Sequence, residues 1–149
     1  MGVSASIDIK IISKGEFNIT SMYLIECLIN KGWEIKDTNN KICYLPLNDD
    51  DMFDWQEDIF SDTKFTELVF QKENIQEIIG LNIFWSNSNI GISLLIYPNH
   101  EISLMLSINR VKINNATEDI TDVSWYLEKV IPCFNTDNIC IENIMFTQD

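Results

Sequence analysis

The sequence predicts a single α+β domain, in which two or three helices pack on one face of a mainly antiparallel sheet. Three observations indicate this class. The chain has 149 residues, the usual length of one domain. Apolar residues make up 46% of it, enough to build a core without metals or disulfides. Segments with alternating apolar residues, typical of strands, are separated by segments with helical spacing. No repeat or linker composition divides the chain, so we expect residues 1–149 to form one unit.

The chain opens with a predicted strand and a predicted helix. In residues 3–12 the apolar side chains alternate with Ser, Asp and Lys, which is the pattern of a half-buried strand. Asn18 or Thr20 is a suitable N-terminal cap for a helix that runs to about Asn30. Apolar residues recur at helical spacing within it, and Gly32 is the type of residue that ends a helix.

A hairpin and an acidic segment are predicted next. Residues 33–35 and 42–45 flank the polar sequence 37–40, which is typical of two strands joined by a turn, and Pro46 ends the second strand. Residues 48–62, called here the acidic segment, contain seven acidic residues and no basic one. Apolar and aromatic side chains lie among these acids.

The rest of the chain predicts two more helices and several strands. A helix is expected over residues 64–79, with Gly80 as its end. Three antiparallel strands with polar turns between them are expected at residues 81–85, 90–97 and 102–108. An extended piece at 111–113 then leads to a helix over 120–131, which Pro132 stops. A final edge strand begins at Ile139.

The charge of the chain is strongly acidic. Asp and Glu number 23 against 10 Lys and Arg, which gives a formal net charge of −13. Such a field repels nucleic acid and anionic membranes, and it attracts basic partners. An acidic surface also keeps a protein soluble without any further role. We therefore expect no nucleic-acid or membrane partner, and the sequence leaves the oligomeric state open.

The sequence also indicates a compartment. No apolar run is long enough to cross a bilayer, and residues 1–13 lack a basic region followed by an apolar block. We therefore expect no signal peptide and a cytoplasmic protein. None of the four cysteines belongs to a C-x-x-C pair, so we expect reduced and mostly buried thiols. They are Cys27, Cys43, Cys133 and Cys140.

No recognisable catalytic set is present, and we expect no enzyme activity and no cofactor. The glycines are isolated, which excludes the common glycine-rich phosphate loops. His100, the one histidine, is expected in a solvated turn. Asp49, Asp50 and Asp51 could gather a divalent cation, but a solvated acidic loop is favoured over a metal site. Arg110 is expected to pair with Asp119 or Asp122, or to bind a ligand.

The acidic segment is the predicted partner-binding surface. Its acids would attract a basic protein, and its aromatic side chains are of the kind that anchor interfaces. Trp55 and Phe60 could equally fold inward onto the core of the protein. The predicted contact residues are Asp49, Asp50, Asp51, Phe53, Asp54, Trp55, Glu57 and Asp58.

The run DDDMFDWQED at residues 49–58, the predicted α+β order and the AT-rich bacterial look of the composition resemble small immunity proteins of bacterial polymorphic toxin systems. The resemblance implies a cytoplasmic inhibitor that binds the catalytic domain of a toxin, often a basic nuclease, by direct protein contact. Three alternatives remain. They are an acidic phage protein that mimics DNA, an enzyme that uses carboxylates with or without a metal, and a domain that binds a small ligand or has a purely structural role.

Overall fold

An eight-stranded antiparallel sheet organises the protein, confirming the α+β class. The computed structural model describes residues 2–114 and 118–149. The strand order is β4-β3-β5-β6-β7-β1-β8, and β2 pairs with β5 beside this path. The strands are β1 (Ala5–Ser13), β2 (Trp33–Glu34), β3 (Lys41–Tyr44), β4 (Gln56–Ile59), β5 (Ile79–Trp85), β6 (Gly91–Ile96), β7 (Ile102–Ile108) and β8 (Ile139–Gln148). The helices are α1 (Ser21–Ile29), α2 (Asp62–Asn74), α3 (Val123–Val130) and the 3-10 helix η1 (Ile131–Phe134).

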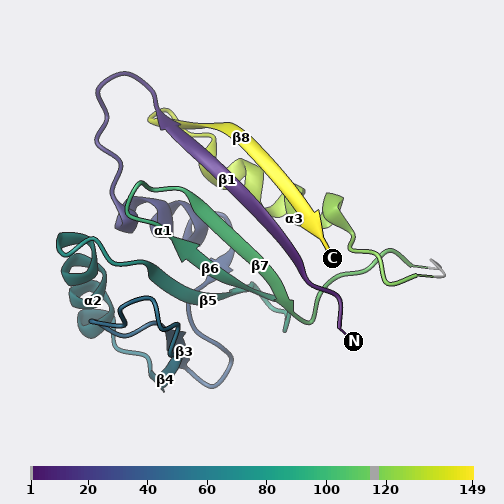
Figure 1. The fold of residues 1–149 in the computed structure, drawn as a ribbon, viewed down its shortest axis with the longest axis horizontal. Helices are drawn as coiled ribbons and strands as arrows, with labels where there is room; N and C mark the ends of the chain where they lie inside the picture. Colours follow the sequence, from purple (N-terminus) through teal and green to yellow (C-terminus); the bar gives the residue numbers. More distant parts are fainter. Residues whose placement is uncertain (1, 115–117) are drawn as a thin grey trace.

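Alternation along the strands gives the sheet one apolar face. Ile7 and Ile9 of β1 are almost fully buried, whereas Asp8 between them is exposed. Ile7 pairs with Leu104 of β7 on one side and with Phe146 of β8 on the other. Figure 1 shows α3 behind β1 and β8, α1 behind β6 and β7, and α2 at the far end of the sheet near β3 and β4. The helices therefore cover the apolar face.

One cluster of buried side chains joins the sheet to all three helices. It includes Leu24 and Ile25 of α1, Phe65 and Val69 of α2, and Tyr126 of α3. Helical spacing places these side chains on the faces that meet the sheet. The longest helix has 13 residues, and none in the described part of the chain is long and apolar enough to cross a membrane.

Three tryptophans and a lysine close the core at one end. Trp33 is 1% exposed, and its ring lies 5.3 Å from that of Trp85 and 6.4 Å from that of Trp125. The ammonium of Lys129 lies 5.3 Å and 5.2 Å from the ring centres of Trp85 and Trp125, within the range of a cation–π contact. Gly32 has φ +112° and abuts the ring of Trp85, so a side chain would not fit there. Packing accounts for these tryptophans.

The predicted hairpin of residues 33–35 and 42–45 is wrong. The polar turn does form, since the Asp37 N–H donates to the Lys41 carbonyl at 3.0 Å. The two extended pieces do not pair with each other, however. Trp33 of β2 pairs with Trp85, and Tyr44 of β3 pairs with Leu81, so both strands line the same edge of β5. The longer β5 offers each short segment a partner that is already buried.

The second predicted helix ends earlier than expected, and Gly80 does not stop it. The helix α2 ends at Asn74, and Gln76, with φ 59°, redirects the chain. Ile79 then enters β5, where it pairs with Ile96 and is 2% exposed. Burial in the sheet therefore outweighs the helical pattern of these residues.

The last third of the chain also differs in detail from the prediction. The helix α3 begins at Val123, because the Asp122 carboxylate caps it by accepting from the Trp125 N–H at 3.2 Å. The α-helix ends at Val130, one residue before the predicted end, and the chain continues as η1, where Pro132 lies near the start and its missing N–H costs nothing. The extended piece predicted at 111–113 pairs antiparallel with residues 120–122 through a single bridge between Lys112 and Thr121, flanked by backbone hydrogen bonds.

Candidate functional site

The acidic segment forms a loop and then a strand at the edge of the sheet. After the loop of residues 48–55 comes β4, which pairs with β3 and is the last strand in that direction. All of its residues, Gln56 to Ile59, are exposed. The sequence did not predict this strand because Ile59 is its one apolar residue, so no alternation marks it.

A buried lysine of α2 binds the chain just before the loop. Lys72 is completely buried, and its ammonium donates to the carbonyls of Leu45 at 3.1 Å and Pro46 at 2.8 Å. Burial lowers the pKa of Lys72, while the nearby carboxylates of Glu77, Asp49 and Asp51 act to raise it. Glu77 lies 3.9 Å from the ammonium. The acids of this region therefore also stabilise a buried charge.

Two carboxylates accept hydrogen bonds from the backbone of the loop. The Glu77 carboxylate accepts from the Asn48 N–H at 2.9 Å. Asp49 is 8% exposed, and its carboxylate accepts from the N–H groups of Phe53 at 2.8 Å and Asp54 at 2.9 Å. Asp49 was predicted to contact a partner, but the structure places its carboxylate inside the loop, where it organises the backbone.

Several loop residues adopt a left-handed backbone. Asn48, Asp50, Asp51 and Phe53 have φ values of 62°, 52°, 57° and 54°. Asn and Asp tolerate this region better than other residues with side chains, but for Phe it is unusual. Each such residue costs of the order of 1 kcal/mol. The hydrogen bonds that Asp49 and Glu77 accept from the loop backbone offset this strain.

The aromatic residues of the acidic segment divide between the core and the surface. The ring of Trp55 reaches to within 3.0 Å of the position that a Cβ on Gly80 would occupy, and Leu45 fills the rest of that space. Phe60 packs against the core, with its ring 6.2 Å from that of Phe65. Phe53, in contrast, is 42% exposed. Trp55 and Phe60 therefore support the fold, and Phe53 remains available to a partner.

Met52 is an exposed apolar residue that the prediction left out. It is 76% exposed and follows Asp51 at the tip of the loop. A single Met between an Asp and a Phe belongs to no periodic pattern, so only the structure of the loop shows that Met52 is exposed. We call the exposed set the acidic end; it comprises Asp50, Asp51, Met52, Phe53, Asp54, Glu57 and Asp58.

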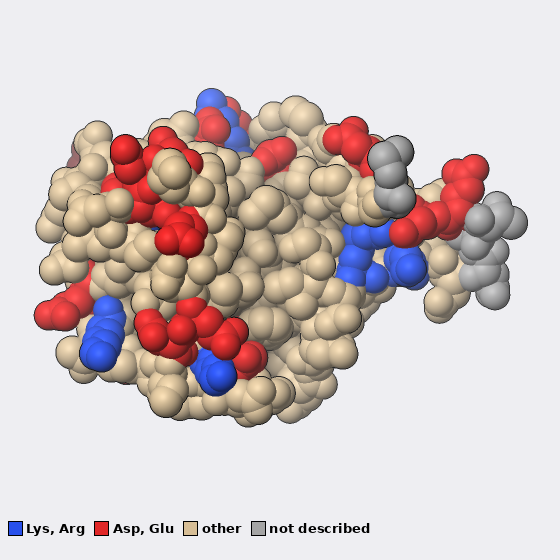
Figure 2. Space-filling view, turned by 60° about the horizontal axis from the view of Figure 1, so that its bottom comes forward, with Lys and Arg blue, Asp and Glu red and all other residues tan. Residues whose placement is uncertain are grey.

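The acidic end lies where α2, β3 and β4 meet. Figure 2 shows groups of acidic side chains over this part of the molecule, on the left, and a broad uncharged area beside them. Glu57 forms an exposed ion pair with Lys41 at 3.5 Å. Asp58 accepts a hydrogen bond from the Tyr44 hydroxyl, which raises the pKa of Tyr44 to about 12. Among the residues that the structure describes, Glu57 is the one carboxylate of the acidic end that forms an ion pair, although Lys72 lies near Asp51.

The other candidate residues have structural roles. His100 is not a free surface residue as expected, because its Nε2 lies 3.0 Å from the Glu73 carboxylate, which also accepts from the Ser21 N–H at 2.9 Å. This contact joins the β6–β7 turn to α1 and α2. Arg110 pairs with Asp119, one of the two predicted partners, and donates to Thr121 at 2.7 Å.

The four cysteines are free thiols, and in the part of the chain that the structure describes they do not join carboxylates in a metal centre. Cys27 and Cys133 are buried, Cys43 and Cys140 are half-buried, and all four are free. Burial raises the pKa of Cys133 to about 12, and the neighbouring Cys27 adds to this effect. Within residues 2–114 and 118–149, no group of three or more His, Cys, Asp or Glu side chains is placed to hold a metal ion.

Comparison with known proteins does not assign the chain to a group. Searches against protein-family models, curated proteins and solved structures find no match to this sequence or fold. The functional argument therefore depends on the geometry of the acidic end.

Proposed function

We propose that this protein is a binding inhibitor that recognises a basic protein domain through its acidic end, as immunity proteins recognise toxins. One observation carries the proposal. A strained loop, organised by the Asp49 carboxylate, presents Met52 and Phe53 to solvent among acidic side chains. A loop fixed in this way loses little conformational freedom on binding, which favours affinity.

The two kinds of side chain would have different tasks in the complex. Carboxylates accelerate the encounter with a basic partner over distances of about a Debye length, roughly 8–10 Å at physiological salt. Apolar side chains at the centre of an interface provide most of the affinity once the partner has docked. Phe53 and Met52 are suited to the second task, because they lie between Asp51 and Asp54 and are exposed.

Two variants distinguish the contribution of the acidic end to binding from that of the overall net charge. The test variant changes four exposed acids of the acidic end to Asn, which tolerates the positive φ of Asp50 and Asp51. These residues are Asp50, Asp51, Asp54 and Asp58. The control variant removes four exposed acids elsewhere by Gln or Asn substitution. These residues are Glu16, Glu26, Glu128 and Asp137.

The test is affinity capture of the products of the adjacent reading frames by each protein, at low and high salt. We expect the wild type and the control variant to retain a stoichiometric complex with a basic protein at low salt. The test variant should lose most of this complex. The wild type and the control variant should also inhibit the toxic activity of the captured protein more strongly than the test variant does. If the test variant captures and inhibits as well as the wild type does, the acidic end is not the binding surface.

A further inference from the structure

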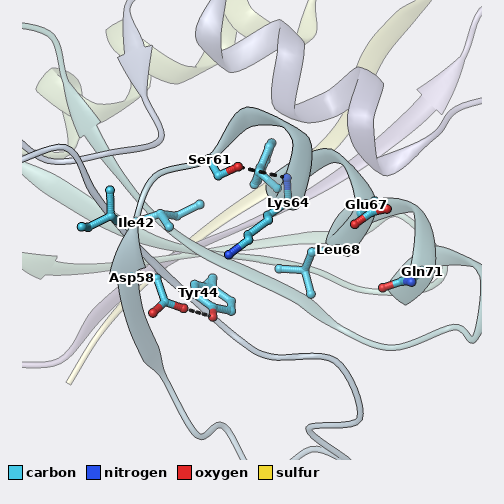
Figure 3. A pocket seen from close by; sticks show the side chains of 10 residues that line it. Ile42, Tyr44, Asp58, Ser61, Lys64, Glu67, Leu68 and Gln71 are labelled. Atoms are coloured by element: carbon cyan, nitrogen blue, oxygen red, sulfur yellow. Dashed lines mark hydrogen bonds between the residues drawn. The ribbon is translucent and has the colours of Figure 1, made fainter.

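An apolar groove lies beside the exposed strand β4. It has a volume of about 190 Å³ and lies between β4 and the first turns of α2. Ile42, Phe65 and Leu68 form its apolar walls, and Asp58 and Glu67 contribute carboxylates. Figure 3 shows these groups around the groove, with Lys64 extending from α2 towards Tyr44. Pockets for drug-sized ligands measure about 300–1,000 Å³, so this groove suits one or two side chains.

The outer side of β4 offers free backbone groups. The Phe60 N–H donates to the Asn40 carbonyl at 2.8 Å. This bond shows which residues of β4 direct their backbone groups towards β3. In an antiparallel pair, backbone groups point to the partner strand at every second residue. Asp58, like Phe60, therefore faces β3, whereas the N–H and carbonyl groups of Glu57 and Ile59 point outwards. Because β4 is the last strand, no strand of the described chain pairs with them there.

A strand added next to β4 would use both features at once. Its backbone would bond to the groups of Glu57 and Ile59, which is the usual mode of strand addition at a sheet edge. Every second side chain of the added strand would point to the helix-covered side of the sheet. There it would meet the groove between β4 and α2. Ile59, which is 74% exposed, would gain apolar contact from the same strand.

Charge selects the kind of strand that fits. Five acidic residues lie on or beside this edge against three lysines, Lys36, Lys41 and Lys64; the acids are Asp54, Glu57, Asp58, Asp62 and Glu67. Like charges directly opposite each other on paired strands are destabilising. A second copy of this chain would bring Glu57 and Asp58 close to their equivalents, and its net charge of −13 adds to the repulsion. A basic strand is complementary instead.

We propose that β4 binds an extended, basic segment of the partner protein as an additional strand, with one apolar side chain of that segment in the groove. This inference rests on the proposed function and adds the mode of recognition. Edge strands commonly carry charges that prevent unwanted pairing. Here the same acids would exclude acidic strands while favouring a basic one.

The first test uses two synthetic peptides and amide hydrogen exchange followed by NMR. One peptide alternates Lys and Val over seven residues, and its matched control alternates Glu and Val. At ten times its dissociation constant, the basic peptide should slow exchange of the Glu57 and Ile59 N–H groups about tenfold. The acidic peptide should leave both unchanged. Absence of binding, or binding of the basic peptide without protection of these two amides, would overturn the proposal.

The second test removes one outward donor. Ile59→Pro deletes an N–H that β3 does not use, and Ile59→Val keeps it. We expect Ile59→Pro to weaken binding of the basic peptide at least about tenfold, and Ile59→Val to bind as the wild type does. Equal binding by Ile59→Pro would overturn strand addition. Should this variant fail to fold, the exchange experiment on the wild-type protein decides the question.

The same variants separate this inference from the proposed function once the basic partner is in hand. If Ile59→Pro binds the partner as tightly as the wild type does, while the test variant binds it poorly, strand addition is refuted and the acidic end remains the binding surface. A partner that the wild type and the test variant bind equally well would refute the proposed function. Weaker binding by both Ile59→Pro and the test variant supports both proposals.

Discussion

Replacing Lys72 with Met should loosen the loop of the acidic end and lower the stability of the whole protein. Methionine keeps much of the apolar volume of the lysine stem but cannot donate a hydrogen bond. The carbonyls of Leu45 and Pro46, which accept from the ammonium at 3.1 Å and 2.8 Å, would then lose their partner. A matched control is Lys64→Met, on the same helix and exposed.

The expected magnitude follows from two opposing terms. A hydrogen bond from a charged donor contributes about 1.5–3 kcal/mol, so the two bonds together contribute about 3–6 kcal/mol. Removing the charge also removes the cost of burying it, which is several kcal/mol. We expect a net loss of about 2 kcal/mol, because the two carbonyls stay partly buried without a donor. In a domain of this size that corresponds to a fall in Tm of about 4–8 °C.

Urea denaturation gives the free energy of unfolding, and amide exchange reports on the loop. In Lys72→Met, the amides of residues 48–55 should exchange faster, and Lys64→Met should leave them unchanged. The folded protein holds the Lys72 proton less tightly than the unfolded chain does, because burial lowers its pKa. The wild type should therefore gain stability relative to Lys72→Met as the pH rises through the folded pKa towards 10.5. Unchanged stability with an unchanged loop would refute the reasoning.

Other regions of the structure give three further predictions. The hydrogen bond to Asp58 raises the pKa of Tyr44 from 10.0 to about 12, so its stabilisation is complete below pH 10 and is lost as the pH rises towards 12. Unfolding free energy measured against pH should not show this decline in Tyr44→Phe. Gly80→Ala places a Cβ 2.5 Å from Leu45 Cδ1 and should cost about 1–3 kcal/mol in urea denaturation; no loss would mean that the loop does not pack there. Burial raises the pKa of Cys133 to about 12, so iodoacetamide at pH 8 should modify it at least roughly a hundredfold more slowly than an exposed thiol, as mass spectrometry can check.

The regular spacing of apolar residues, and the burial of those residues in the structure, explain why much of the fold could be predicted. In β1, β7 and α1 one face is apolar and the other polar, so local pattern and tertiary packing agree. Ile79 shows where they disagree, because it continues the helical pattern of α2 but becomes buried in β5. The pairing of β2 with β5 could not be predicted either. The turn at 37–40 has the residues of a hairpin, and only the position of β5 excludes that pairing.

The amino-acid composition of residues 48–62 identifies the candidate site, but only the structure shows the role of each residue in it. A run of acids among aromatic residues marks the acidic segment, but it cannot show that Asp49 is buried and organises the loop. Lys72 gave no sequence signal, since a lysine on a helix is usually solvated. The packing of Trp55 depends on the absence of a side chain at Gly80, far away in sequence. Long-range contacts of this kind do not appear in local patterns.

The rate of association with the basic partner, measured by stopped flow against salt concentration, tests the central claim that the carboxylates of the acidic end attract that partner. For the wild type and the control variant, the rate constant should fall steeply as salt is added. The test variant should associate about tenfold more slowly at low salt and show a flatter salt dependence. A test variant with the rate and salt dependence of the wild type would contradict the account.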